Sequence, residues 1–378
     1  MKILHIPNYM YPHIGGIEQT ARDILNSVPE GTEQRVICFG HERGDKVDKV
    51  DGVDVVRADC FAKVFSQSLS FSYGRLLKKQ FLQFRPDTVV FHYPNPFVAH
   101  ILLKQLKKHP ECRLILWWHL DITKQKLLGK FFNNQTEKLL KRACRVITTS
   151  PNYMHSSPFL SRYAQKCTVI PSCINGERLK EDKNSLAIAK RIREENKDKI
   201  ICFAVGRHVE YKGYEYLIKA SAMLGDEYAV YLGGDGELTE KLKKLAEGDK
   251  KIKFLGRISD EELKAYMSAC DIYCFPSITK NEAFGLALAE AMSFGKPAVT
   301  FTIEGSGVNF VNLKDVTGLE VENRNAQAFA EAIKTLGEDK KLRARLGKNA
   351  EKRVEELFTF AKFKENVRQL FAGLEDKN

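Results

Sequence analysis

Two glutamates lie eight residues apart in the small, apolar stretch NEAFGLALAEAMSFG, residues 281–295. The near neighbours of Glu290 are all apolar, so a helix here would offer its carboxylate no wet face. A buried carboxylate needs hydrogen-bond donors, and the vicinal hydroxyls of a ribose are suitable ones. Glu282 comes before the predicted helix, where a favourable contact with the helix dipole would also explain it.

Two cations follow an apolar run, IICFAV, in the segment GRHVEYKG. Arg207 and Lys212 would leave a strand end together with Gly206, and fixed cations at such a point suit a diphosphate leaving group. The alternative is a solvated loop with two ordinary surface cations. Gly234 belongs to a second turn, GGDGEL, which would either let a ligand approach the backbone or simply make a tight turn.

The first half of the chain holds comparable candidates. In PHIGGIEQTARDIL, Gly15 and Gly16 precede a helix whose free backbone N–H groups could face an anion, or the two glycines merely cap a turn. In RLILWWHLDIT, His119 and Asp121 follow a strongly apolar run, and His92 has the same placement after VVF. The spacing leaves open whether His119 or Asp121 faces a ligand, and a lone histidine is more often structural.

These residues can form one site only in a fold that brings the ends of several strands together. Short β-rich runs alternate with helix-periodic ones from MKILHI to RVITTS and again from KIICFAVG onwards, which is the pattern of βαβ units with parallel sheets. The sequence therefore predicts two doubly wound α/β domains, over residues 1–175 and 176–357, with a last helix at about 358–371. Residues 176–198 are polar and suit a linker with a short exposed helix. Ligands of such sheets bind beyond the carboxyl ends of the strands, in a crevice.

Composition agrees with a two-domain protein. The chain has 378 residues, 43% of them hydrophobic, which is enough for two packed cores. Its nine cysteines include no repeated CxxC pair and are interpreted as reduced core residues of a cytoplasmic protein. The start MKILHIPNYMYP is too short in apolar residues for a signal peptide, and no stretch reaches the 18 apolar residues of a membrane span.

The net charge of +12 is concentrated in the first half. From Arg75 to Arg145 there are 15 Lys or Arg and 4 Asp or Glu, interleaved with Leu and Phe in runs such as RLLKKQFLQF and KLLKRACR. This pattern suits a surface that lies on anionic lipid at the inner face of the plasma membrane. The alternative is a set of ordinary helices with solvated cations. Nucleic acid would use the same charge, but no recognition motif accompanies it.

The ordered set of motifs resembles the retaining, nucleotide-sugar-dependent glycosyltransferases of family 4. The segments that carry the resemblance span about 320 residues: GGIE, VGRHVEYKG, GGDGEL, DIYCFPS, the E-x7-E pair in NEAFGLALAEAMSFGKPAV, and TGLEV. The resemblance implies the GT-B fold, two Rossmann-like domains facing across a cleft, with the final helix at 358–378 returning to the first domain. IEGSGVNF departs from the simpler double-glycine turn of many members, so no role is assigned to Gly305 or Gly307.

The resemblance also implies roles for individual residues. Arg207 and Lys212 match the pair that binds the donor diphosphate, Glu290 the acid that holds the ribose, and Glu282 the acid near the donor sugar. The remaining matches are the backbone around Phe284, Gly285 and Leu286 near the sugar and phosphates, Gly206 and Gly234 at the donor, Gly15 and Gly16 under the diphosphate, and His119 facing the sugar.

The implied reaction transfers a sugar from a nucleoside diphosphate, UDP rather than GDP, to a hydroxyl of a glycan or polyprenyl-linked saccharide in cell-surface polysaccharide or glycolipid assembly. The acceptor attacks on the face that the leaving group departs from, and no metal or other cofactor is implied, because Lys and Arg stabilise the diphosphate. Two alternatives stay open. One is a nucleotide-sugar epimerase of the same build, and the other is a non-catalytic sugar-binding protein, which the two glutamates and the Arg/Lys pair disfavour.

Overall fold

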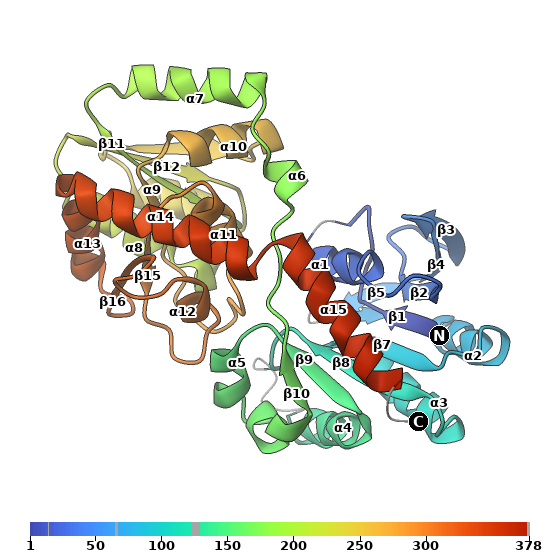
Figure 1. Cartoon of the computed structure of the whole chain (residues 1–378). Helices are drawn as coiled ribbons and strands as arrows, with labels where there is room; N and C mark the ends of the chain where they lie inside the picture. Colours follow the sequence, from blue (N-terminus) through green and yellow to red (C-terminus); the bar gives the residue numbers. More distant parts are fainter. Residues whose placement is uncertain (14, 65–66, 123–128, 376–378) are drawn as a thin grey trace. The chain divides into compact units, whose positions relative to one another are not determined.

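The computed structural model describes residues 1–13, 15–64, 67–122 and 129–375 of the chain, and these residues form two compact units (Figure 1). Unit 1 comprises Met1–Pro171 and Phe363–Asn378, and unit 2 comprises Ser172–Lys362. The sequence placed these divisions at 175 and 357, so the observed positions differ by a few residues.

Unit 1 is built on an eight-stranded sheet in the order β10-β9-β8-β7-β1-β2-β4-β3, parallel except for β3. Its strands are β1 Lys2–Ile6, β2 Glu33–Phe39, β3 Lys46–Val50, β4 Val53–Ala58, β7 Thr88–Tyr93, β8 Arg113–Trp118, β9 Arg145–Thr148 and β10 Cys167–Val169. A separate hairpin pairs β5 (Ala62–Val64) with β6 (Gln67–Leu69). The central strand β7 is buried along its whole length, in agreement with the apolar run VVF at its centre.

Helices connect the strands of unit 1. They are α1 Gly16–Leu25, α2 Tyr73–Gln83, α3 Pro96–Lys108, α4 Gly129–Arg142, α5 Pro151–Ser156 and the 3₁₀ turn η1 Leu160–Lys166. Helix α3 begins where the sequence favours it, because the Asn95 side chain accepts a hydrogen bond from the Val98 backbone N–H at 3.1 Å and Pro96 follows directly.

Unit 2 has a six-stranded, all-parallel sheet in the order β13-β12-β11-β14-β15-β16. Its strands are β11 Ile200–Val205, β12 Tyr228–Gly233, β13 Ile252–Gly256, β14 Ile272–Phe275, β15 Ala298–Phe301 and β16 Gly318–Val321. Its helices are α6 Gly176–Leu179, α7 Lys183–Glu195, α8 Tyr214–Ser221, α9 Thr239–Leu245, α10 Asp260–Ala269, α11 Leu286–Ser293, α12 Val308–Val311, α13 Ala326–Glu338 and α14 Lys340–Leu357, with the 3₁₀ turn η2 Glu210–Lys212. The prediction of two doubly wound parallel-sheet domains is confirmed.

The polar segment 176–198 is not a linker with an exposed helix. Helix α7 packs along α10 and buries Ser185, Ala189 and Ile192, while Arg193 binds Asp271 through two hydrogen bonds of 2.8 and 3.0 Å (Figure 1). The charged residues on the outer face of α7 outnumber the apolar ones on its buried face. This imbalance made the segment resemble a solvated linker.

The C-terminal helices also differ from the prediction. The 18-residue helix α14, rich in Lys, Arg and Glu, was not predicted, although it packs on α11. The last helix, α15, runs over Phe360–Glu375, and the ring of Phe363 lies 5.9 Å from that of Trp117 in unit 1. Trp117 belongs to β8, so α15 covers a face of the unit 1 sheet.

The strand orders create one topological switch point in each sheet. In unit 2 the chain moves outward from β11 through β12 to β13, then returns to the other side with β14, so the loops after β11 and β14 are neighbours. In unit 1 the corresponding neighbours are the loops after β1 and β7. Crevices at such points are where open α/β sheets bind their ligands.

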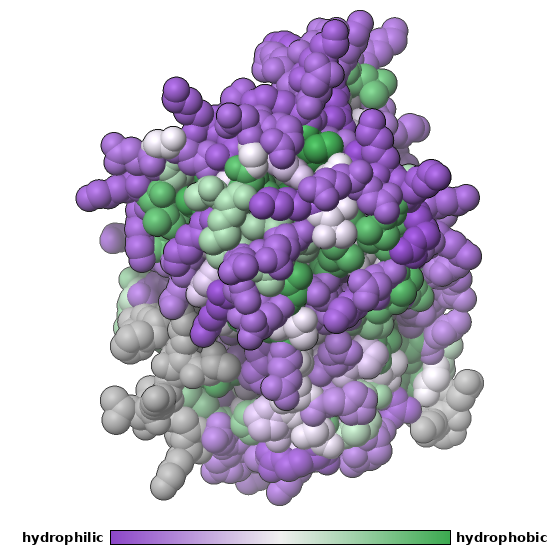
Figure 2. All heavy atoms as spheres, turned by 90° about the vertical axis from the view of Figure 1, so that its left-hand side faces the viewer, coloured by the Kyte–Doolittle hydropathy of each residue, from purple (hydrophilic) through white to green (hydrophobic). Residues whose placement is uncertain are grey.

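The face shown in Figure 2 is mostly hydrophilic, with hydrophobic side chains in small groups between the polar ones. Within the described ranges, no helix is both long and apolar enough to span a membrane. All nine cysteines are free thiols, and most of them are buried, in agreement with the interpretation as reduced core residues.

Candidate active site

The switch point of unit 2 brings Lys212 and Glu282 into direct contact. Lys212 ends the 3₁₀ turn after β11, Glu282 lies in the loop after β14, and their charged groups form an ion pair. The two side chains are only 12% and 13% exposed. The Ser277 hydroxyl donates to the same carboxylate at 3.3 Å, and the Lys212 ammonium lies 5.0 Å from the centre of the Phe275 ring. A cation and an anion thus occupy one sheltered position.

Gly213 makes this contact possible. It has a φ of 63°, and a Cβ atom at this position would overlap the carbonyl of Pro276, which begins the loop after β14. The Ile278 backbone N–H donates to the Tyr211 carbonyl at 2.9 Å and ties the two loops together. The glycine that follows Lys212 is therefore required by the close approach of two loops.

Gly206 and Gly234 lie against each other at the ends of β11 and β12. Gly234 has a φ of 110°, and a Cβ atom there would overlap the Gly206 carbonyl. Beyond them, the ring of His208 shares a 2.8 Å hydrogen bond with the Thr239 hydroxyl at the start of α9. The contact between the two backbones accounts for the glycine at 234.

Arg207 does not join the Lys212–Glu282 pair. Its side chain is exposed, and its guanidinium donates to the Tyr211 hydroxyl at 3.4 Å. The structure therefore separates the two cations that the sequence grouped: one is sheltered in an ion pair and the other extends into solvent.

Helix α11 begins at Gly285, whose φ of 92° turns the chain into the helix. No side chain caps this end, so the first backbone N–H groups, from Leu286 on, have no side-chain acceptor. The segment before it, with the buried Phe284, is supported by the turn of IEGSGVNF. Gly307 lies so close that a Cβ atom would overlap the Ala283 carbonyl, and the Ser306 hydroxyl donates to the Glu282 carbonyl at 2.6 Å.

Glu290 lies on the inner face of α11 and is 7% exposed. Its carboxylate accepts a hydrogen bond from the guanidinium of Arg178, which also donates to Asp260 at 2.7 Å. Burial raises the pKa of Glu290, and the positive charge of Arg178 partly offsets this effect. Sequence reasoning missed Arg178 because it lies in the segment taken for a linker. The signal that could have indicated such a residue is that a buried carboxylate such as Glu290 needs a cation close to it.

In unit 1, Gly15 and Gly16 begin α1 at the switch point between β1 and β7. Gly15 is the residue before the helix, in an extended conformation, and no side chain caps the helix there. The Asn8 and Asn95 side chains, from the loops after β1 and β7, are hydrogen-bonded to each other. These two loops therefore meet at the carboxyl edge of the unit 1 sheet.

His119 and Asp121 have different surroundings. The Asp121 carboxylate accepts from the Trp118 indole at 3.1 Å and from the Ser157 hydroxyl at 2.8 Å, so it holds the end of β8 to the segment after α5. His119 Nε2 shares a 3.0 Å hydrogen bond with His92 Nδ1, and the two rings are stacked. The other ring nitrogen of His119, Nδ1, takes no part in this bond, whereas the Asp121 carboxylate holds two segments of unit 1 together.

Three buried histidines lie on one face of the unit 1 sheet, and all of them are held neutral. Burial lowers the pKa of His5 to about 4 and that of His119 to about 3, and it lowers the pKa of His92 well below the ordinary 6.5. The ring of His5 shares a 3.0 Å hydrogen bond with the Gln34 side chain. A neutral His119 can accept or donate one hydrogen bond without carrying charge to a ligand.

We expect these histidines to make the protein acid-sensitive. Well above pH 6.5 these histidines are neutral in both the folded and the unfolded protein. Below pH 6.5 the histidines of the unfolded chain take up protons and those of the folded protein do not. The free energy of unfolding therefore falls as the pH drops. Each such histidine lowers the free energy of unfolding by about 2 kcal/mol between pH 6.5 and pH 5. Urea unfolding at several pH values measures this slope. His5→Asn should flatten it and His100→Asn, at an exposed position, should not; an unchanged slope in His5→Asn would contradict the explanation.

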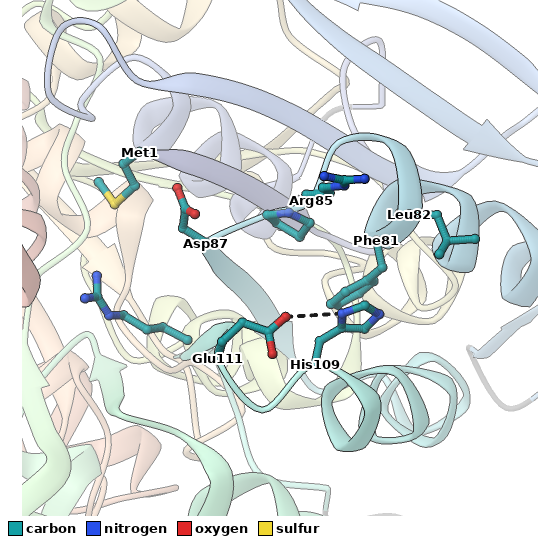
Figure 3. A pocket seen from close by; sticks show the side chains of 9 residues that line it. Met1, Phe81, Leu82, Arg85, Asp87, His109 and Glu111 are labelled. Carbon is teal, nitrogen blue, oxygen red and sulfur yellow. Dashed lines mark hydrogen bonds and ion pairs between the residues drawn. The ribbon is translucent and has the colours of Figure 1, made fainter.

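A further hollow of about 800 Å³ lies at the opposite edge of the unit 1 sheet (Figure 3). Its lining residues precede β1, β7 and β8 or connect to them: Met1, Phe81, Leu82, Arg85, Pro86, Asp87, His109, Glu111 and Arg113. The His109 ring and the Glu111 carboxylate are 3.3 Å apart in it. It lies at the amino ends of the strands, and its lining includes none of the residues that the motifs predict. Across the described parts of both units, no three His, Cys, Asp or Glu side chains group as metal ligands would.

Comparison with known families gives two matches that together cover most of the chain. Residues 187–353 match the model described as "Glycosyl transferases group 1", and residues 14–178 match the one described as "Glycosyltransferase Family 4". The first match contains both glutamates of the 281–295 stretch and the Lys212 loop, and the second contains Gly15 and Gly16.

Individual proteins are similar over nearly the whole length. The D-rhamnosyltransferase WbpZ of Pseudomonas aeruginosa is 30% identical over 365 residues, covering 95% of this chain and 92% of its own. The O-antigen chain mannosyltransferase C of Escherichia coli is 28% identical over 369 residues, with 95% of each chain covered. The crystal structure of Anabaena HepE in complex with UDP and glucose superposes with a TM-score of 0.76 at 19% identity over 100% of both chains.

Proposed function

Because the chain belongs to the family 4 glycosyltransferases and has their GT-B fold, we propose that it transfers a sugar from a nucleoside diphosphate to a hydroxyl of a glycan or lipid-linked saccharide. The observation that carries the proposal is the sheltered Lys212–Glu282 pair at the switch point of unit 2. The similarity to an O-antigen chain mannosyltransferase supports a place in polysaccharide assembly.

Each loop around the pair has a proposed task at the donor. Lys212 neutralises the diphosphate, and the exposed Arg207 swings onto it from the same loop. The uncapped backbone at Phe284, Gly285 and Leu286 supplies further donors to the phosphates and the sugar. Glu290 accepts from the ribose hydroxyls, and Glu282 accepts from the donor sugar. Gly206 and Gly234 allow the backbone to approach the nucleotide.

In the proposed reaction the bond between the sugar C1 and the diphosphate oxygen breaks while the acceptor oxygen bonds to C1 on the same face. The acceptor proton goes to the departing phosphate oxygen, so no protein base is needed and the anomeric configuration is retained. Lys212 stabilises the negative charge that develops on the diphosphate, which is the task a divalent metal performs in other enzymes. For this reason we propose that transfer is independent of metal.

Two of the relatives support a proposal for the class of donor sugar. One is a mannosyltransferase and another a D-rhamnosyltransferase. Because rhamnose is 6-deoxymannose, these two sugars share the configuration of the ring and differ only at C6. We therefore propose a hexose of this configuration for the present chain.

In unit 1, Gly15, Gly16 and the Nδ1 nitrogen of His119 are proposed ligand contacts, since they lie at the carboxyl ends of their strands.

One assay separates this proposal from the alternatives. The protein is incubated with UDP- and GDP-hexoses, with and without EDTA and with and without polyprenyl-linked saccharides, and the products are separated. We expect a new glycoside, formed only when an acceptor is present, with the anomeric configuration of the donor. An altered free donor formed without acceptor would indicate an epimerase, and binding with no product would indicate a sugar-binding protein. Loss of transfer in EDTA would contradict metal independence.

We also propose that unit 1 contacts an anionic membrane surface. A groove of about 700 Å³ lies between α3 and α4, with an apolar part formed by Leu103, Leu106 and Pro110. The cationic residues of its lining are Lys104, Lys107, Lys138 and Arg142, and no acidic residue is among the described residues that line it. Cations around an apolar floor match the boundary between headgroups and acyl chains.

Reversing the charge of the groove should release the protein from anionic vesicles. Lys104→Glu with Lys107→Glu removes two cations, each of which contributes about 1 kcal/mol near a charged bilayer, and adds two anions. We expect co-sedimentation with phosphatidylglycerol vesicles at low salt to fall by at least about tenfold. The control is Lys190→Glu, on the outer face of α7 in unit 2. Equal binding by the groove variant and the wild type would contradict the assignment to this groove.

A further inference from the structure

Arg178 connects the buried acid of α11 to the start of α10. Its guanidinium donates to Glu290 through one nitrogen and to Asp260 through the other, the latter at 2.7 Å. The side chain is 31% exposed, so it is partly withdrawn from solvent, while the Glu290 side chain is only 9% exposed. The planar guanidinium can hold two carboxylates in a fixed geometry, which an ammonium group cannot do.

Both ends of this connection are anchored. The backbone N–H of Arg178 donates to the Asn175 side chain at 3.1 Å, which caps the short helix α6. Asp260 is the first residue of α10, where Ser259 and Glu262 form a capping box that fixes the helix start. The cation is thus positioned before any ligand arrives.

Binding the two vicinal hydroxyls of a ribose requires a charged Glu290 carboxylate that is held in a fixed position. An ionised carboxylate accepts from both hydroxyls of a vicinal diol, whereas a protonated one loses part of this capacity. Arg178 contacts one oxygen of Glu290, so the other oxygen keeps its lone pairs for the diol. Removing a cation from a buried acid favours protonation of that acid.

We propose that Arg178 is a positioning residue that fixes the Glu290 carboxylate as the acceptor for the ribose hydroxyls of the nucleotide. This inference rests on the proposed function. Arg178 from α6 and Asp260 from α10 are the charged groups that act on the pKa of Glu290, the first lowering and the second raising it, and the buried Tyr273 of β14 experiences the charge of Glu290. The segment between the last strand of unit 1 and α7 therefore serves the nucleotide site of unit 2.

Nucleotide affinity as a function of pH tests this role. UDP and GDP are each titrated calorimetrically into the wild type, Arg178→Met, Arg178→Gln and Glu290→Gln between pH 6 and pH 8.5. The matched control is Arg193→Met, which breaks another arginine–aspartate pair in unit 2, that with Asp271. We expect the affinity of the wild type to change with pH only as far as the phosphate of the free nucleotide takes up a proton. In Arg178→Met, affinity should fall about tenfold for each pH unit below the raised pKa of Glu290.

Arg178→Gln keeps a polar hydrogen-bond donor but not the charge, so it should show the same pH dependence if Arg178→Met does not fold. Arg193→Met should bind like the wild type at every pH. A profile parallel to that of the wild type in both Arg178 variants, with or without a uniform loss of affinity, would overturn the inference and leave Arg178 a structural residue. If Glu290→Gln bound like the wild type, or the wild type bound neither nucleotide, the ribose assignment in the proposed function would fail, and the inference with it.

Discussion

Lys212→Ala should lose transfer activity by a factor of about 10² to 10³ while the protein stays folded, because an ordered cation at a leaving group contributes on this scale. The Lys212 ammonium is 12% exposed and held against Glu282, so it meets a diphosphate already positioned and partly desolvated. The lost interaction strengthens as the leaving group gains charge. We therefore expect the larger effect in kcat, measured with saturating donor, and a smaller one in donor affinity.

The matched control for this variant is Lys251→Ala. Lys251 pairs with Asp249 at 2.9 Å, and the two side chains are 16% and 10% exposed, so this pair resembles the Lys212–Glu282 pair in burial but lies elsewhere in unit 2. Both variants lose an ion pair of mostly buried side chains, and thermal unfolding should report similar shifts. Near-normal turnover in Lys212→Ala, or an equal loss in Lys251→Ala, would contradict the role given to Lys212.

Glu282→Gln should lower turnover by a similar factor, about 10² or more, with nucleotide affinity nearly unchanged. The substitution keeps the shape of the side chain but removes the negative charge that accepts from the donor sugar. UDP and GDP lack the sugar, so their binding should not detect the loss. Turnover is measured with the nucleotide sugar, and affinity is measured by titration with the nucleotide alone.

The competing explanation of Glu282 is a charge at a helix N-terminus that serves stability only. Its contribution would then be about 0.3 to 1 kcal/mol, visible in unfolding and absent from turnover. Glu262→Gln provides the comparison, because Glu262 is an acid in the first turn of α10, outside the candidate site. If Glu282→Gln and Glu262→Gln both changed stability alone, the placement of Glu282 at the donor sugar would be wrong.

The parts of the site that could be predicted from sequence are those at strand ends. Lys212 and Glu282 follow the apolar runs of β11 and β14, and the strand order makes these two loops neighbours. Their direct contact depends on the switch point between β11 and β14, which the alternation of elements does not reveal. The turn at Gly307 gave no family signal, yet it supports the backbone beside Glu282 through Ser306.

Charged helices explain most of what could not be predicted. Both α7 and α14 are dominated by Lys, Arg and Glu, and their apolar residues are too few to dominate the pattern, although each packs against another helix of unit 2. Arg178 was missed because it lies in the same polar segment as α7, residues 176–198, which was taken for a linker. The choice between His119 and Asp121 likewise depended on partners from distant segments, Ser157 and His92, which no local spacing encodes.

The most direct test of the central claim, that the loops at the unit 2 switch point bind the nucleotide, is hydrogen–deuterium exchange with and without UDP or GDP. We expect slower exchange in residues 206–213, 234–239 and 282–290, which surround the Lys212–Glu282 pair and the start of α11. Slower exchange confined to residues 81–87 and 109–113, which line the hollow of Figure 3, would contradict it.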